Sequence, residues 1–420
     1  MKNILILLSL QIIYSSSMEA QNYDESKIPQ YSLPDILLSE SGQLAETVDA
    51  WEKVRRGEVL ELFRDQMYGK VPEFKYTKDY QHRVLKNAEF KEGATQEEVT
   101  ITIANDRDEI KITLLLTLPK NTKGPVPIFL GLNFYGNQAT SPNKEVTVTD
   151  NYVLNNENLG IINHHADETS RGGRLSSWPL EMILEKGYGL ATIHCGDIDP
   201  DFDDGFKNGV HSLLDARPGA DEWGTISAWA WGLSRAMDYL ETDERIDNHR
   251  VAVIGHSRLG KTSLWAGATD ERFALVISND SGCGGAALSR RGIGETVEVI
   301  NTSFPHWFCQ NFHKYNGNED DLPLDQHMLI ALMAPRPVYV ASAQEDQWAD
   351  PKGEYTSLVL AGPAYELYGF ESLNIMELPP IDTPVKAGKQ GYHIRTGEHA
   401  LTEYDWEQYL KFADVHLSDE

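Results

Sequence analysis

The segment Gly255–Lys261 (Gly-His-Ser-Arg-Leu-Gly-Lys) has the residue types of a serine nucleophile on a tight turn. It follows the apolar run Val251–Ile254, which predicts a buried strand, and it precedes Thr262–Gly267, which predicts a helix. A strand–turn–helix junction exposes the Ser257 hydroxyl and directs the free N–H groups of the helix toward developing negative charge. The pattern therefore indicates nucleophilic catalysis by Ser257, although the second glycine, Gly260, comes one residue later than in the general G-x-S-x-G motif.

A serine hydroxyl needs a general base, and a third group must orient that base. In a sheet of this type the acid and then the histidine follow the serine along the chain. Among 13 histidines, His399 lies between the last predicted strand, Gly391–Arg395, and the last predicted helix, Glu403–Leu417. That loop belongs at the carboxyl ends of the strands, where the serine turn also opens. We therefore expect His399 to be the base.

Two aspartates could orient the base. Asp280 follows the predicted strand Phe273–Ser278, and Asp346 follows Pro337–Ser342. Both positions lie at the sheet edge where the serine is expected, so topology alone leaves the two candidates open.

The elements that must position these residues alternate between apolar strands and helices. Further strands are predicted at Glu98–Ile103, Ile110–Leu118, Pro125–Leu132 and Gly189–His194, and further helices at Trp51–Phe63 and Ile226–Leu240. This alternation predicts an α/β fold with a doubly wound, mostly parallel sheet between two helical layers, a three-layer αβα sandwich. Residues 133–176 are polar and irregular and predict a long surface insertion.

The 420 residues indicate three parts. Residues 1–20 combine a basic start with an apolar stretch and small residues, which predicts a secretory signal peptide and a periplasmic or secreted protein. Residues 21–75 predict a loop and helical segment packed on the core, and residues 76–420 the catalytic domain. The net charge of −27 argues against nucleic-acid and membrane partners. We expect a monomer.

Three motifs together resemble the glucuronoyl esterases, carbohydrate esterase family 15, in their bacterial form. They are Gly255–Lys261, Asn279–Gly285 (Asn-Asp-Ser-Gly-Cys-Gly-Gly) and Glu345–Pro351 (Glu-Asp-Gln-Trp-Ala-Asp-Pro), and the turn Gly397–His399 agrees with them. The likeness extends from about Trp51 to the C-terminus. It implies an α/β-hydrolase that cleaves esters between (4-O-methyl-)glucuronic acid on xylan and lignin alcohols, without a metal or other cofactor.

The resemblance also implies roles for single residues. Ser257 would be the nucleophile and His399 the base, and Arg258 would hold the oxyanion. Lys261, Glu295 and Trp348 would contact the sugar. Many members of the family have Glu at the position of Asp280, where it is the triad acid, whereas some bacterial members use the later acid. We place Asp280 ahead of Asp346 and retain both.

The arginine next to Ser257 in the sequence suits the hydrolysis of a uronate ester. Attack on such an ester creates an alkoxide, which an adjacent guanidinium stabilises through charge-assisted hydrogen bonds. The alternatives are an acetyl xylan esterase or a related carbohydrate esterase with the same triad, and a catalytically silent sugar-binding homologue.

Three other signals are set aside. The acidic segment Asp197–Gly205 departs from the spacing of a calcium loop, and we interpret it as a solvated loop. The pair His164 and His165 lacks a third ligand at useful spacing, so we expect no metal. The three cysteines are too few for a disulfide framework, and we expect no bridge.

Overall fold

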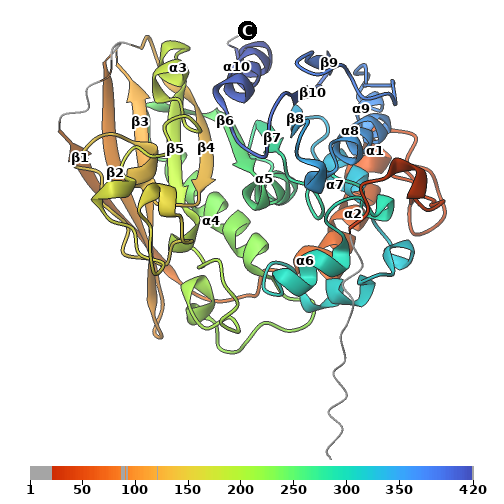
Figure 1. Ribbon diagram of the computed structural model, residues 1–420, viewed down its shortest axis with the longest axis horizontal. Helices are drawn as coiled ribbons and strands as arrows, with labels where there is room; N and C mark the ends of the chain where they lie inside the picture. The colour runs from red at the N-terminus through yellow and green to blue at the C-terminus, as the bar shows by residue number, and fades with distance from the viewer. Residues whose placement is uncertain (1–20, 87–89, 91–92, 121, 419–420) are drawn as a thin grey trace, which may run out of the picture.

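A ten-stranded mixed sheet runs through the whole protein (Figure 1). The computed structural model describes residues 21–86, 90, 93–120 and 122–418, so the predicted signal peptide lies outside the described residues. The strands are β1 (Thr77–Leu85), β2 (Ala94–Ala104), β3 (Glu109–Pro119), β4 (Val126–Asn133), β5 (Gly189–His194), β6 (Ile246–His256), β7 (Leu275–Asn279), β8 (Val338–Ala343), β9 (Val385–Ala387) and β10 (Gln390–Arg395). Their order in the sheet is β1-β2-β3-β5-β4-β6-β7-β8-β10-β9.

The six central strands, in the order β5, β4, β6, β7, β8 and β10, pair in parallel with their neighbours. The strands at both edges of the sheet pair antiparallel. The α-helices are α1 (Val48–Ala50), α2 (Arg56–Phe63), α3 (Leu180–Glu185), α4 (Thr225–Leu240), α5 (Arg258–Thr269), α6 (Val297–Ser303), α7 (Gln326–Ala331), α8 (Pro351–Leu360), α9 (Gly362–Glu366) and α10 (Glu403–His416). In Figure 1, α3 and α10 lie above the sheet and α4 and α5 below it. This arrangement confirms the predicted three-layer α/β fold.

Alternation along β4 shows how the sheet joins two cores. Ile128 and Leu130 belong to the large hydrophobic cluster between the sheet and helices α4 and α5. Phe129, which lies between them in sequence, belongs to the cluster between the sheet and helices α3 and α10. Successive side chains of a strand point to opposite faces, so a strand covered on both faces must be apolar throughout. Each such side chain contributes about 1.5–3 kcal/mol by burial.

The N-terminal helical segment packs against the helix that follows the serine turn. Trp51, Phe63 and Tyr68 are fully buried, and the ring of Tyr68 stacks on Trp265 of α5 with centroids 4.4 Å apart. The Tyr68 hydroxyl donates a 2.8 Å hydrogen bond to the carbonyl oxygen of Gly284. Residues before β1 therefore support both α5 and the loop after β7.

Residues 133–176 consist of loops, isolated bridges and short 3₁₀ turns, as their composition predicts. The prediction that this insertion lies on the surface is wrong for its first part, because residues 137–141 are buried. The Asn137 amide donates to the carbonyl oxygen of Thr113 on β3, and its oxygen accepts from Thr192 on β5. The insertion is therefore fixed to the sheet and forms a wall above it.

Among the helices that the structure describes, none has the length and apolar character that crossing a membrane requires. The thiols of Cys195, Cys283 and Cys309 are free and buried.

Candidate active site

Ser257 stands alone between β6, which ends at His256, and α5, which begins at Arg258. Its backbone has φ 59° and ψ −131°, a conformation that L-residues rarely adopt, and its N–H donates to the carbonyl oxygen of Asn279 at 2.8 Å. Gly255 makes this turn possible, because a Cβ there would lie 1.8 Å from the carbonyl oxygen of Leu259. The junction therefore has the geometry of a nucleophile elbow.

His399 pairs with Asp346. The Nδ1 atom of His399 lies 2.6 Å from Oδ2 of Asp346, which is buried in the loop after β8. The other oxygen of Asp346 accepts a hydrogen bond from the backbone N–H of Ala349. A carboxylate on Nδ1 keeps the proton on that atom and leaves Nε2 free to accept one.

Asp280, which the sequence analysis ranks first, has a different set of partners. Its Oδ2 accepts from the Arg395 guanidinium at 3.5 Å and from the backbone N–H of Ala400 at 3.4 Å, and its Oδ1 is buried without a hydrogen bond. Burial, with the nearby carboxylates of Glu354, Asp405 and Asp346, raises the pKa of Asp280 well above its usual range. The hydrogen bonding of His399 thus favours Asp346 over Asp280.

The backbone around His399 is held by Arg395, a residue that sequence reasoning missed. Its guanidinium donates to the carbonyl oxygens of Glu398 and Ala400, at 2.9 and 2.5 Å, and pairs with Asp405. These bonds fix the loop on both sides of the imidazole.

A second histidine lies against the first. The rings of His256 and His399 have centroids 4.5 Å apart, and the Nδ1 atom of His256 lies 2.6 Å from the amide oxygen of Asn279. Burial and the neighbouring His399 lower the pKa of His256 to about 3. His256 is therefore neutral and adds no charge that would oppose an imidazolium at His399.

Arg258 is anchored by an acidic residue from the loop after β5. Its Nη1 lies 2.5 Å from Oδ2 of Asp201, and its guanidinium lies 4.6 Å from the ring centre of Trp307. Asp201 also accepts hydrogen bonds from His306 and Trp307. Burial alone would raise the pKa of Asp201, but these hydrogen bonds and the charge of Arg258 lower it to about 2.

The interpretation of Asp197–Gly205 as a solvated loop is wrong for its first three aspartates. Asp197, Asp199 and Asp201 are all buried, because each has hydrogen-bond donors from elsewhere in the chain. In the sequence, only the spacing of two residues between these aspartates distinguishes them from an ordinary solvated acidic loop.

Lys261, Glu295 and Trp348 come together on one side of Ser257. The Lys261 ammonium, on the first turn of α5, donates to the carbonyl oxygen of Ser281 at 2.6 Å and lies 3.2 Å from the Glu295 carboxylate. The backbone N–H of Glu295 donates to the carbonyl oxygen of Trp348, a residue that is 39% exposed. These residues line a cavity of about 320 Å³ that Ser257, Asp346 and His399 also border. Its polar groups are of the kind that bind sugar hydroxyls.

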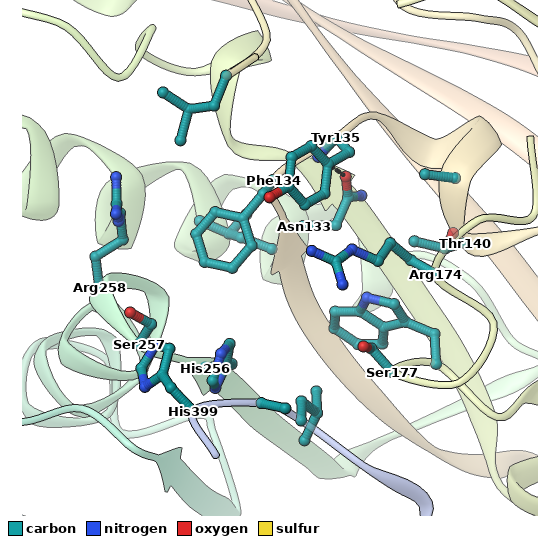
Figure 2. Close-up of a pocket in the computed structure, with 16 residues that line it drawn as sticks. Asn133, Phe134, Tyr135, Thr140, Arg174, Ser177, His256, Ser257, Arg258 and His399 are labelled. Atoms are coloured by element: carbon teal, nitrogen blue, oxygen red, sulfur yellow. Dashed lines mark hydrogen bonds between the residues drawn. The ribbon is translucent and has the colours of Figure 1, made fainter. Parts of the chain in front are cut away.

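A second cavity, of about 230 Å³, also opens at Ser257 (Figure 2). It shares Ser257, Arg258 and His399 with the first cavity. Its remaining walls come from the end of β4, the insertion that follows it, residues 177 and 178, His256 and the segment after His399. An ester bound at Ser257 can thus extend in two directions.

A metal ion would find one group of suitable ligands in the described part of the chain. Ligand atoms of Asp280, Asp346 and His399 lie within 4.8 Å of one another. The hydrogen bond between His399 and Asp346 already uses two of these side chains.

Comparison with known proteins identifies relatives over nearly the whole chain. A family model described as glucuronyl esterase, fungi, matches residues 207–369. The carbohydrate esterase MZ0003, from an unknown prokaryotic organism, is 50% identical over 94% of this chain and 92% of its own length. A protein of Podospora anserina named 4-O-methyl-glucuronoyl methylesterase is 31% identical over 43% of this chain and 40% of its own.

The solved structures that superpose on this chain belong to the same family of esterases. A promiscuous CE15 esterase from a marine bacterial metagenome superposes with a TM-score of 0.87 at 49% identity, over 94% of this chain and all of that one. The glucuronoyl esterase from Solibacter usitatus gives a TM-score of 0.88 at 44% identity, with the same coverage. The chain therefore belongs to carbohydrate esterase family 15, the glucuronoyl esterases, as an α/β-hydrolase of the bacterial type and a carboxylic ester hydrolase.

Proposed function

We propose that this enzyme hydrolyses esters of (4-O-methyl-)glucuronic acid on glucuronoxylan through an acyl-enzyme formed at Ser257. The observation that carries the proposal is the strained elbow at Ser257, with the His399–Asp346 pair and Arg258 beside it and the Lys261–Glu295 pair in the adjoining cavity. The names of the relatives from fungi and bacteria support the same substrate class.

In the first half of the reaction, the Ser257 oxygen attacks the ester carbonyl while His399 takes the hydroxyl proton on Nε2. Asp346 stabilises the resulting imidazolium through its hydrogen bond to Nδ1. The alkoxide that forms receives charge-assisted hydrogen bonds from Arg258 and from the free N–H groups at the start of α5. The tetrahedral intermediate then collapses, the C–O bond to the alcohol breaks, and His399 returns its proton to the leaving oxygen.

In the second half, water attacks the glucuronoyl–Ser257 ester. His399 removes a proton from the water, and collapse of the second intermediate releases glucuronate and regenerates Ser257. No redox partner or metal is needed to balance these steps.

Recognition of the acyl half is assigned to the polar cavity. Lys261 and Glu295 present a donor and an acceptor to ring hydroxyls, and the exposed face of Trp348 offers an apolar surface for the sugar ring. Lys261 and Arg258 present their donors from ion pairs with Glu295 and Asp201, so they act on the substrate oxygens through directed charge-assisted hydrogen bonds.

The test compares benzyl glucuronate with an acetylated xylo-oligosaccharide. We expect release of glucuronate by the wild type, a loss of at least about 10³-fold in kcat for Ser257→Ala, and no change for Ser303→Ala, an exposed serine at the end of α6. Release of acetate alone would instead assign the enzyme to the acetyl esterases. Binding of xylan with no turnover of either substrate would identify a silent homologue.

The features of residues 1–20 support export, with cleavage after Ala20. Mass spectrometry of the protein recovered from the periplasm or medium tests this, because the mature chain should begin at Gln21.

A further inference from the structure

The two cavities at Ser257 differ in chemistry. The first cavity holds the buried Lys261–Glu295 ion pair, whereas the second combines apolar and aromatic walls with the polar side chains of Asn133, Thr140 and Ser177. These walls include Leu132, Phe134, Tyr135, Leu154, Trp178 and Leu401. A sugar suits the first cavity and an apolar group the second, so the alcohol half of the ester belongs in the second cavity.

The position of His399 agrees with this division. The imidazole must return its proton to the leaving alcohol oxygen, and His399 borders the second cavity together with Ser257. The cavity volume of about 230 Å³ exceeds the ~150 Å³ that accommodates a benzene ring in an apolar protein cavity. One aromatic ring therefore fits there.

One charged side chain of this cavity, that of Arg174, has no carboxylate partner in the described part of the chain. Figure 2 shows the Arg174 guanidinium extending into it from the wall opposite Ser257, and the ring of Tyr135 lies 4.7 Å from the guanidinium carbon. Among the described residues, no carboxylate pairs with Arg174 and no side-chain hydrogen bond reaches it. The neighbouring Arg171 is paired with Glu168, and Arg258 with Asp201.

The absence of a partner is unexpected in a protein with 64 acidic and 37 basic residues. A guanidinium held beside apolar walls gains most from an anionic group, which it binds through two parallel charge-assisted hydrogen bonds. We infer that the second cavity binds the alcohol half of the ester and that Arg174 selects aromatic alcohols bearing a carboxylate. The inference rests on the proposed function for its acyl half and goes beyond it in naming the class of alcohol.

The test uses two esters that differ only in the alcohol, benzyl glucuronate and 4-carboxybenzyl glucuronate. For the wild type we expect kcat/KM about tenfold higher for the carboxybenzyl ester, mainly through KM, as one charge-assisted contact predicts. Arg174→Met should abolish the preference, and Arg174→Lys, which keeps the charge without the bidentate geometry, should retain only part of it.

The matched control is Arg217→Met, which removes an exposed arginine from another region and changes the net charge equally. It should leave the preference unchanged. Equal kcat/KM for the two esters in the wild type, or a preference that persists in Arg174→Met, would overturn the inference.

Product inhibition gives a second measurement that needs no variant. Free 4-carboxybenzyl alcohol should inhibit the wild type at about tenfold lower concentration than benzyl alcohol, and equal inhibition would contradict the inference. If neither glucuronate ester is hydrolysed, the proposed function fails by itself. The acetates of the same two alcohols then test the cavity separately, with the same preference expected.

Discussion

The carboxylate of Asp201 lies 2.5 Å from the Arg258 guanidinium, although 57 residues separate them in the chain. His306 and Trp307 donate to the other oxygen of this carboxylate. Asp201 is therefore fully bonded, and Arg258 is fixed in direction beside Ser257. An oxyanion-stabilising group is effective when it is oriented before the reaction begins.

Asp201→Asn should lower kcat about tenfold, because Arg258 loses the anion that orients it. KM should change less, because Lys261 and Glu295 keep their own ion pair. Steady-state kinetics with benzyl glucuronate measures the effect. The control is Asp203→Asn, an exposed aspartate of the same loop, which should stay within about twofold of the wild type. Equal losses of kcat in the two variants would show that Asp201 affects activity only through the structure of its loop and does not orient Arg258.

The two candidate acids should separate on substitution. Asp346→Asn should lower kcat about 10³- to 10⁴-fold, because an amide on Nδ1 favours the wrong tautomer of His399. Asp280→Asn should cost about tenfold or less, because the hydrogen bonds of Asp280 go to Arg395 and to the Ala400 N–H, and an amide oxygen can still accept them. Both variants are compared by kcat on one ester. A loss in Asp280→Asn as large as that in Asp346→Asn would make Asp280 the acid.

Much of the sheet is predictable because its buried strands are continuous apolar runs. Two strands escaped prediction for physical reasons. β1 is polar and largely exposed at the edge of the sheet, and β9 has three residues. Neither contains the apolar pattern on which a prediction from sequence depends.

The site was predictable where a local motif fixes its geometry, as at Ser257. It was not predictable where the partner comes from far along the chain. Nothing near Asp201 indicates that Arg258 and Trp307 will surround it, and nothing near Arg174 indicates that it will lack a partner. Such pairings follow from tertiary packing, and a single sequence does not contain them.

The pair Lys261 and Glu295 should show strong coupling in a double-mutant cycle. Both side chains are buried, so Lys261→Met or Glu295→Gln alone leaves one partner without its ion pair. We expect each single variant to lose stability and the double variant to recover about 1–3 kcal/mol relative to the sum. Urea unfolding measures the coupling, and additive losses would argue against it.

The same three variants should weaken uronate esters selectively. We expect kcat/KM for benzyl glucuronate to fall at least about tenfold, with much smaller changes for benzyl acetate, which has no ring hydroxyls for the pair to bind. Parallel losses on both esters would remove Lys261 and Glu295 from sugar recognition.

Glu354 should make the stability of the enzyme depend on pH. This carboxyl is fully buried under the loop after β7, where it accepts hydrogen bonds from the backbone N–H groups of Ser281 and Gly282 and from the Ser342 hydroxyl. Burial is the largest influence and raises the pKa of Glu354 to about 7, although these hydrogen bonds oppose it. In the unfolded chain the group titrates near its ordinary value of 4.5.

Between these two values the folded protein holds a proton that the unfolded chain has released. The contribution of Glu354 to stability is therefore fully present below about pH 4.5 and is lost as the pH rises through 7. Glu354→Gln lacks the titrating carboxyl. As the pH rises from 4.5 to 8, its free energy of unfolding should therefore increase by about 3 kcal/mol relative to that of the wild type. Ser342→Ala keeps the titrating carboxyl and loses one donor to it, so its pH dependence should persist. Urea unfolding at several pH values tests both variants, and a constant difference between Glu354→Gln and the wild type would show that Glu354 is already ionised throughout.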